Sequence, residues 1–164
     1  MDNNTTNTLS VSALKVQNVL LLMGLDCKVI EFRESTRTSA EAAERVGCQI
    51  GQIVKSLIFR GQDSGKPVLV LTSGANRVDE IIISHYAGES ICRADAEFVR
   101  TQTGFAIGGV PPVGHLQPLE TYIDEDLLQY RQIWGAAGTP NAVFAMTPAD
   151  LGKMSSGKVI KVKT

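Results

Sequence analysis

Apolar residues recur along this chain in two spacings, one typical of helices and the other of strands. After Ser10, apolar positions fall near helical spacing as far as Met23, and Gly24 follows as a stop signal. Thr38-Ser39-Ala40-Glu41 has the spacing of a capping box and predicts a second helix that ends at Gly47. Further helices are predicted over residues 78–86, 94–101 and 125–130, and from Pro148 onward.

Apolar runs of strand length lie between these helices. Residues 53–60 and 67–72 flank a turn-rich segment and are interpreted as a β-hairpin. Short strands mixed with helices indicate the α+β class, with a mixed, curved sheet. We expect a single domain over residues 1–164, with residues 1–9 as a flexible tail. The remaining strands are predicted over residues 27–32, 90–93, 120–124, 133–138, 142–146 and 158–163.

The composition is that of a soluble globular protein, with 43% hydrophobic and 20% charged residues. The longest apolar runs, residues 19–23 and 81–83, are far shorter than the roughly 20 residues that cross a bilayer, so no membrane partner is expected. The N-terminal segment lacks the basic and then apolar order of a secretory signal, which favours a cytoplasmic location. A net charge of -1 gives no overall attraction to nucleic acid, so DNA is not expected as a partner and an RNA contact would be local.

Three motifs do not indicate a nucleotide site, a disulfide set or a metal site. Gly152 to Val159 matches a P-loop for seven positions, but Val159 stands where a Ser or Thr should hold magnesium, and no helix is predicted to follow. The three cysteines lack the spacing of a disulfide set or a zinc site. The acidic cluster Asp124-Glu125-Asp126 is interpreted as a solvated helix start rather than a metal site. We therefore expect no metal and no other cofactor.

Lys55 is the first candidate for chemistry. It is the lone cation within Gln52-Ile53-Val54-Lys55-Ser56-Leu57-Ile58-Phe59, where β-branched and aromatic residues predict a strand. An ammonium in such a run suits a site that handles a phosphate or an ester. The alternative is a lysine on an edge strand that prevents aggregation.

The second candidate is the segment from Gly104 to His115. It packs four glycines, two prolines and a histidine into twelve residues, a composition that fixes a loop backbone. An ordinary loop between a helix and a strand is the alternative. His115 closes the segment and is a candidate pocket residue, whereas His85 lies in a predicted helix and is interpreted as structural or exposed.

Three segments together resemble the YbaK/ProX family in order and spacing: residues 53–57, 104–115 and 137–144. The resemblance spans about residues 11–162. It implies a mixed, barrel-like sheet surrounded by helices. Free-standing members of that family hydrolyse wrongly charged aminoacyl-tRNA, and the family is similar to the editing domain of bacterial prolyl-tRNA synthetases. The partner implied is the acceptor end of an aminoacyl-tRNA, with an aminoacyl-tRNA synthetase as a further candidate.

The resemblance also implies roles for particular residues. Lys55 would contact the phosphate or ester end of the acceptor, and Gly109 would let the loop backbone approach the ester closely. No side chain is an obvious general base, which is compatible with a water positioned by the loop and aided by a ribose hydroxyl of the substrate. Arg60, Arg77, Lys158 and Lys161 are further candidates for RNA contact. Substrate-binding roles are implied for Ser56, Gly108, Val110, Pro111, Pro112, His115, Gly138, Thr139 and Asn141.

The leading hypothesis is a trans-editing deacylase that removes a small amino acid, such as alanine, from tRNA(Pro). Alanine is favoured over cysteine because the chain has Ala136, Ala137 and Val143 where cysteine-specific relatives look more polar. A pocket that accepts the cognate amino acid cannot strongly reject a smaller one, so a second site hydrolyses the mistakes. The alternatives are a non-catalytic module that binds tRNA or a synthetase, and a hydrolase of small-molecule esters.

Overall fold

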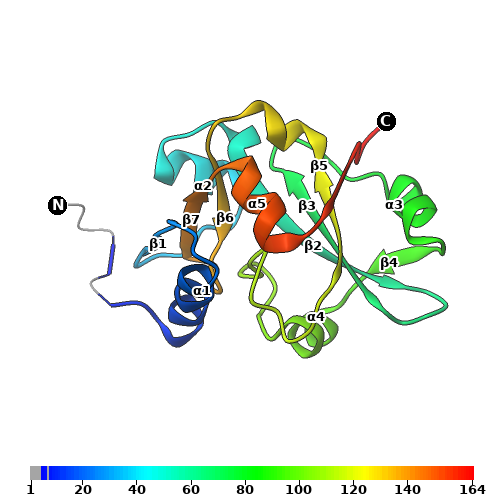
Figure 1. Ribbon diagram of the computed structural model, residues 1–164, viewed down its shortest axis with the longest axis horizontal. Helices are drawn as coiled ribbons and strands as arrows, with labels where there is room; N and C mark the ends of the chain where they lie inside the picture. Colours follow the sequence, from blue (N-terminus) through cyan, green and yellow to red (C-terminus); the bar gives the residue numbers. More distant parts are fainter. Residues whose placement is uncertain (1–4, 7) are drawn as a thin grey trace.

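The computed structural model describes residues 5–6 and 8–164, and in that part of the chain eight strands form one mixed sheet (Figure 1). Its strand order is β1-β7-β6-β2-β3-β5-β8, and β4 pairs with β2 beside this path. The α+β class with a mixed sheet is therefore confirmed. The strands are β1 (Val29–Glu31), β2 (Ile53–Gly61), β3 (Pro67–Ser73), β4 (Ile91–Arg93), β5 (Glu120–Asp124), β6 (Ile133–Ala136), β7 (Ala142–Met146) and β8 (Lys158–Ile160).

The helices begin at residues whose side chains cap them. Ser10 and Thr38 accept hydrogen bonds from the first turns of α1 and α2, as the sequence predicts. Asp95 caps α4, so that helix begins and ends two residues later than predicted. No helix of the described residues is both long enough and apolar enough to cross a membrane. The α-helices are α1 (Val11–Leu22), α2 (Ser39–Val46), α3 (Glu80–Ala87), α4 (Ala96–Thr103) and α5 (Pro148–Ser155), and the 3₁₀ helices are η1 (Ile50–Gln52) and η2 (Glu125–Gln129).

The structure corrects the interpretation of the acidic cluster and agrees with setting the P-loop-like motif aside. The acidic cluster is not a solvated helix start throughout, because Asp124 is 1% exposed and caps η2 with a buried carboxylate. Residues 152–155 of the P-loop-like motif form the last turn of α5. A true P-loop would instead be a loop that connects a strand to a following helix. Of the tail expected over residues 1–9, residues 1–4 and 7 lie outside the described part, and Thr5 forms a β-bridge with Phe32.

The core has two faces, one on each side of the sheet. On one face α1, α4 and α5 pack against side chains such as Val54 and Ile58 of β2 (Figure 1). On the other face α3 packs against Phe59 and its neighbours, and α2 packs against Ile53. Alternate residues of β2 therefore face opposite layers, which places Lys55 on the side of α2 and α3.

The middle of β2 lies at a gap in the sheet. One edge of β2 pairs with β3 from Val54 to Arg60. The other edge pairs with β6 at Ile53 and Val54, and with β4 only from Phe59 onward. Between these two pairings, residues 55–58 have no strand beside them among the described residues. β2 as a whole has strands on both sides, but Lys55 lies in the part of β2 that pairs on one side only, with β3.

Candidate active site

A cavity of about 420 Å³ opens at this gap in the sheet, and we call it the main cavity. Its walls come from the middle of β2, the start of α2, β4, the segment from Ile107 to Val110, and the strands β6 and β7. Of the residues predicted from the sequence, Lys55, Ser56, Gly108, Val110 and Thr139 line it. Segments far apart in the sequence therefore meet in one hollow of the size that binds small ligands.

Lys55 is half-buried on the wall of the main cavity. Its Nζ atom donates a hydrogen bond to the main-chain carbonyl oxygen of Asn76 at 3.1 Å. Burial, and then the nearby positive charge of Arg93, lower the pKa of Lys55 from 10.5. Its partner is a neutral carbonyl, so the hydrogen bond orients the ammonium without cancelling its charge.

The charge of the cavity wall is one-sided. Arg37 and Arg93 line it together with Lys55, and among the described residues no Asp or Glu side chain does so. Cations gathered without a carboxylate repel one another until an anion enters. The main cavity is thus suited to a negatively charged ligand such as a phosphodiester.

The Gly/Pro segment is held in place by hydrogen bonds of its own backbone. The Gly109 N–H donates to the Ala106 carbonyl at 3.0 Å, and the Gly109 carbonyl accepts from the Gly138 N–H at 2.9 Å. A Cβ atom on Gly109 would lie 2.7 Å from Thr139 Cα, so only glycine lets the two loops approach this closely. The N–H groups of Gly108 and Val110 meet no acceptor within the described part of the chain, although both residues line the main cavity.

Pro111, Pro112 and His115 form the C-terminal part of the Gly/Pro segment. His115 Nε2 lies 2.6 Å from the Pro111 carbonyl oxygen, which can only accept, so Nε2 carries the proton. Burial lowers the pKa of His115 below its usual 6.5, which keeps the ring neutral at neutral pH. Pro112 and His115 line a second cavity of about 390 Å³ and are not among the residues of the main cavity.

The turn between β6 and β7 contributes unequally to the main cavity. Thr139 lines it, while Gly138 and Asn141 do not. Thr139 Oγ1 lies 3.0 Å from a carboxylate oxygen of Glu31, and the amide nitrogen of Asn141 donates to the Phe32 carbonyl. These contacts tie the turn to β1, so Asn141 holds the shape of the turn in the structure.

Ser56 carries an unsatisfied hydroxyl. Its Oγ atom is shielded from solvent, and among the described residues it has no hydrogen-bond partner. A buried hydroxyl without a partner costs free energy in the folded state.

Replacing Ser56 with alanine is therefore expected to leave the free energy of unfolding unchanged or to raise it by about 1 kcal/mol. Urea denaturation of the two proteins measures this difference. Thr72→Val serves as the comparison, because the Thr72 hydroxyl donates to Asp124 at 3.0 Å and its removal should destabilise the protein. A loss of more than about 1 kcal/mol on Ser56→Ala would show that the hydroxyl has a partner.

Sequence reasoning missed two of the cations at the main cavity. Arg93 reaches it because β4 pairs with the far end of β2, and Arg37 because it precedes α2. Neither contact follows from local sequence pattern. Of the cations proposed for RNA contact, Arg60 lies over the ring of Phe98 and Lys158 over that of Tyr86, and neither lines the main cavity.

Comparison with known proteins shows the family to which this chain belongs. The model of the aminoacyl-tRNA editing domain matches residues 33–154, most of the chain. A crystal structure described as "a putative trans-editing enzyme for prolyl tRNA synthetase" is 48% identical, with a TM-score of 0.91 over 96% of this chain and 99% of that one. The "Putative Cys-tRNA(Pro)/Cys-tRNA(Cys) deacylase EbsC" of Enterococcus faecalis is 27% identical over 134 residues, 81% of each protein.

The chain also matches a part of a synthetase sequence. A proline-tRNA ligase of Limosilactobacillus fermentum is 33% identical over 94 residues, which are 55% of this chain and 16% of the ligase. The family match contains Lys55, the loop around Gly109 and the turn at Thr139, the three parts that meet at the main cavity. The resemblance to the YbaK/ProX family is therefore confirmed, and the chain belongs to the aminoacyl-tRNA editing domain family.

Proposed function

We propose that this protein hydrolyses the ester bond between a wrongly attached amino acid and its tRNA, with the acceptor end bound in the main cavity. One arrangement carries the proposal: among the described residues, the main cavity is lined by cations and by no carboxylate, and also by Gly108 and Val110, whose N–H groups have no acceptor. The cations suit the phosphates of an RNA end, and the N–H groups suit an oxyanion. Membership of the editing-domain family supports the same conclusion.

The backbone of the Gly/Pro segment and the cations of the main cavity have different roles in the proposed reaction. Water adds to the ester carbonyl carbon, and the resulting oxyanion accepts hydrogen bonds from the Gly108 and Val110 N–H groups. The C–O bond to the ribose then breaks, and the proton that the attacking water gives up passes to the leaving ribose oxygen, which yields the free amino acid and the tRNA hydroxyl. Gly109 shapes this loop rather than donating, because its own N–H is bound to Ala106. Lys55, with Arg37 and Arg93, holds the acceptor phosphates.

A small aliphatic amino acid, such as alanine, is the proposed acyl group. Ala136, Ala142 and Val143 give the main cavity an apolar wall next to Thr139. An aliphatic side chain would pack against this wall without leaving a polar group unpaired. The proposed carrier is tRNA(Pro), and the likeness to a prolyl-tRNA trans-editing enzyme and to a proline-tRNA ligase supports it.

A panel of esters tests this proposal. Alanyl-, cysteinyl-, seryl- and prolyl-tRNA(Pro) are each mixed with excess protein, and the remaining ester is followed in a single turnover. We expect alanyl-tRNA(Pro) to be hydrolysed fastest and prolyl-tRNA(Pro) to survive. Faster loss of the cysteinyl ester would contradict the alanine preference alone. Survival of every ester, with tRNA still bound, would favour the non-catalytic binding module.

The lowered pKa of Lys55 predicts a pH dependence of RNA binding. An anion binds the charged ammonium, and in the free protein this form is lost at a pH below 10.5. The affinity for a 5′-CCA-3′ trinucleotide should therefore fall as the pH rises toward that value. Arginine stays charged there, so Lys55→Arg should show a shallower decline. Equal declines in the two proteins, measured by fluorescence anisotropy, would show that Lys55 does not hold the RNA.

A further inference from the structure

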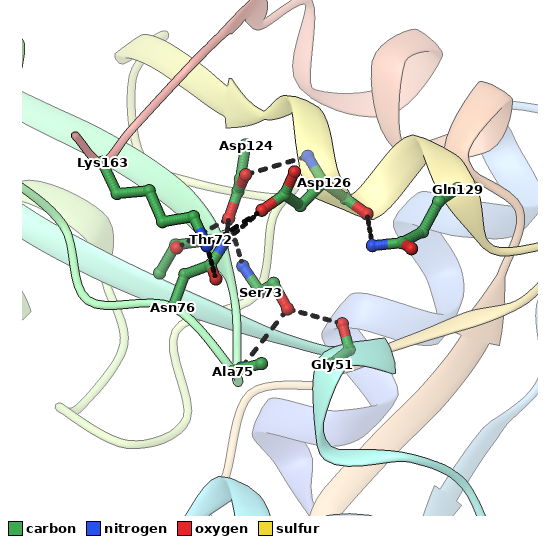
Figure 2. Close-up of polar contacts among 9 residues, drawn as sticks. All are labelled: Gly51, Thr72, Ser73, Ala75, Asn76, Asp124, Asp126, Gln129 and Lys163. Atoms are coloured by element: carbon green, nitrogen blue, oxygen red, sulfur yellow. Dashed lines mark hydrogen bonds and ion pairs between the residues drawn. The ribbon is translucent and has the colours of Figure 1, made fainter.

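A buried carboxylate contacts the turn of residues 73–76, in which the Asn76 carbonyl accepts the hydrogen bond of Lys55. Asp124, at the end of β5, is 1% exposed. One of its oxygens, Oδ2, accepts hydrogen bonds from Thr72 Oγ1 at 3.0 Å, the Ser73 N–H at 2.9 Å and Asn76 Nδ2 at 2.8 Å. Its other oxygen accepts from the Asp126 N–H at 2.9 Å. Figure 2 shows these donors converging on Asp124 from the end of β3 and from the start of η2.

Every polar group of Asn76, in the side chain and in the main chain, takes part in a hydrogen bond. Its side-chain nitrogen donates to Asp124 and, at 2.7 Å, to Asp126 Oδ2, and its side-chain oxygen accepts from Lys163 Nζ at 3.0 Å. Its main-chain N–H donates to the Ser73 carbonyl at 3.0 Å. The remaining group, the main-chain carbonyl, is the acceptor of the Lys55 ammonium. These contacts agree with the orientation of the Asn76 amide in Figure 2, because its nitrogen faces two acceptors and its oxygen faces a donor.

The turn is also anchored from the side of β2. Ser73 Oγ donates to the Gly51 carbonyl at 2.7 Å, and the Gly74 N–H donates to the Ile53 carbonyl at 2.7 Å. Residues 73–76 are therefore tied both to the start of β2 and to the end of β5. A carbonyl held in this way can fix the direction of a flexible lysine side chain, which has four rotatable bonds of its own.

We propose that Asn76 is a positioning residue for Lys55, with the buried carboxylate of Asp124 holding its amide in place. This inference rests on the proposed role of Lys55 in binding the acceptor end. The Lys55 ammonium is oriented by a neutral carbonyl, while the carboxylates of this network, Asp124 and Asp126, accept hydrogen bonds from the Asn76 side chain. Lys55 is thereby oriented and keeps its charge for the substrate.

The test compares Asn76→Ala with the native protein in two measurements. In single-turnover deacylation we expect a rate about 10-fold lower, because small displacements of catalytic groups have large effects. By NMR we expect a lower order parameter at Lys55 Cε, since the carbonyl that holds the ammonium is no longer fixed. Gln129→Ala is the matched control: Gln129 touches the same network only through the Asp126 carbonyl and is exposed. It should change neither measurement.

A second pair of variants separates positioning from general loss of structure. In a Lys55→Ala background, Asn76→Ala should lower the rate no further, because Asn76 acts through Lys55. An equal loss in both backgrounds, or an unchanged order parameter at Lys55, would overturn the proposal. Thr72→Val, which removes one donor to Asp124 while keeping the shape, should give a smaller effect of the same kind if Asn76→Ala fails to fold. If the native protein hydrolyses no ester, the proposed function fails, and the NMR measurement still decides the positioning.

Discussion

Replacing Lys55 with alanine is expected to lower the single-turnover rate of deacylation about 10²- to 10³-fold. The variant removes a cation of the main cavity whose direction is fixed by its hydrogen bond to the Asn76 carbonyl. Loss of a preorganised donor to developing charge typically costs about 3–4 kcal/mol in the transition state, and a phosphate that is no longer held would misplace the ester to similar effect. The rate of ester loss from alanyl-tRNA(Pro) with excess protein gives the effect directly.

The control for this prediction is Lys66→Ala. Lys66 is an exposed lysine in the loop of the β2–β3 hairpin and is not among the residues lining the main cavity. Its removal takes away the same charge without touching the site. Thermal unfolding should show both variants folded. Equal activity of Lys55→Ala and Lys66→Ala would mean that Lys55 has no part in the reaction.

Replacing Gly109 with alanine is expected to lower both stability and activity. The added Cβ would lie 2.7 Å from Thr139 Cα, which is backbone and cannot move aside as a side chain does. Overpacking of this kind costs about 1–3 kcal/mol of unfolding free energy. The two loops must separate, which moves the Gly108 and Val110 N–H groups, and a misplacement of about 1 Å can lower a rate 10²-fold. Urea denaturation and single-turnover deacylation measure the two effects.

Gly152→Ala is the matched control for the second prediction. Gly152 lies within α5, and a Cβ there would meet no atom within 4 Å. Alanine in a helix is favoured over glycine by about 0.5–1 kcal/mol, so this variant should be slightly more stable and equally active. If Gly109→Ala behaves in the same way, the close approach of the two loops has no functional role.

The secondary structure could be predicted largely from local signals. The hairpin of β2 and β3, the strand β5 and the caps at Ser10 and Thr38 follow from short-range pattern, and the structure has them. The boundaries of α4 were displaced because Asp95 acts as the cap, which an apolar pattern does not reveal. Local sequence therefore predicted which elements exist better than where each of them begins.

The site could be predicted only in part, because it is assembled by contacts between distant segments. Lys55 stood out as a cation in an apolar run, and the Gly/Pro segment by its composition. Arg93 could not be found in that way, since it reaches the main cavity through the pairing of β4 with β2. The same is true of Asp124, whose burial depends on donors from Thr72, Ser73 and Asn76. An acidic run looks solvated in sequence until the strands around it are known.

The central claim is that the aminoacyl end of the tRNA binds in the main cavity, at the gap beside β2. An NMR titration of the ¹⁵N-labelled protein with a non-hydrolysable alanyl-adenosine, in which an amide replaces the ester, tests it most directly. We expect the backbone signals of Lys55, Gly108 and Val110 to shift, while those of His115 and Ser156 at the second cavity stay in place. Shifts confined to the second cavity, with the signals around Lys55 unchanged, would contradict it.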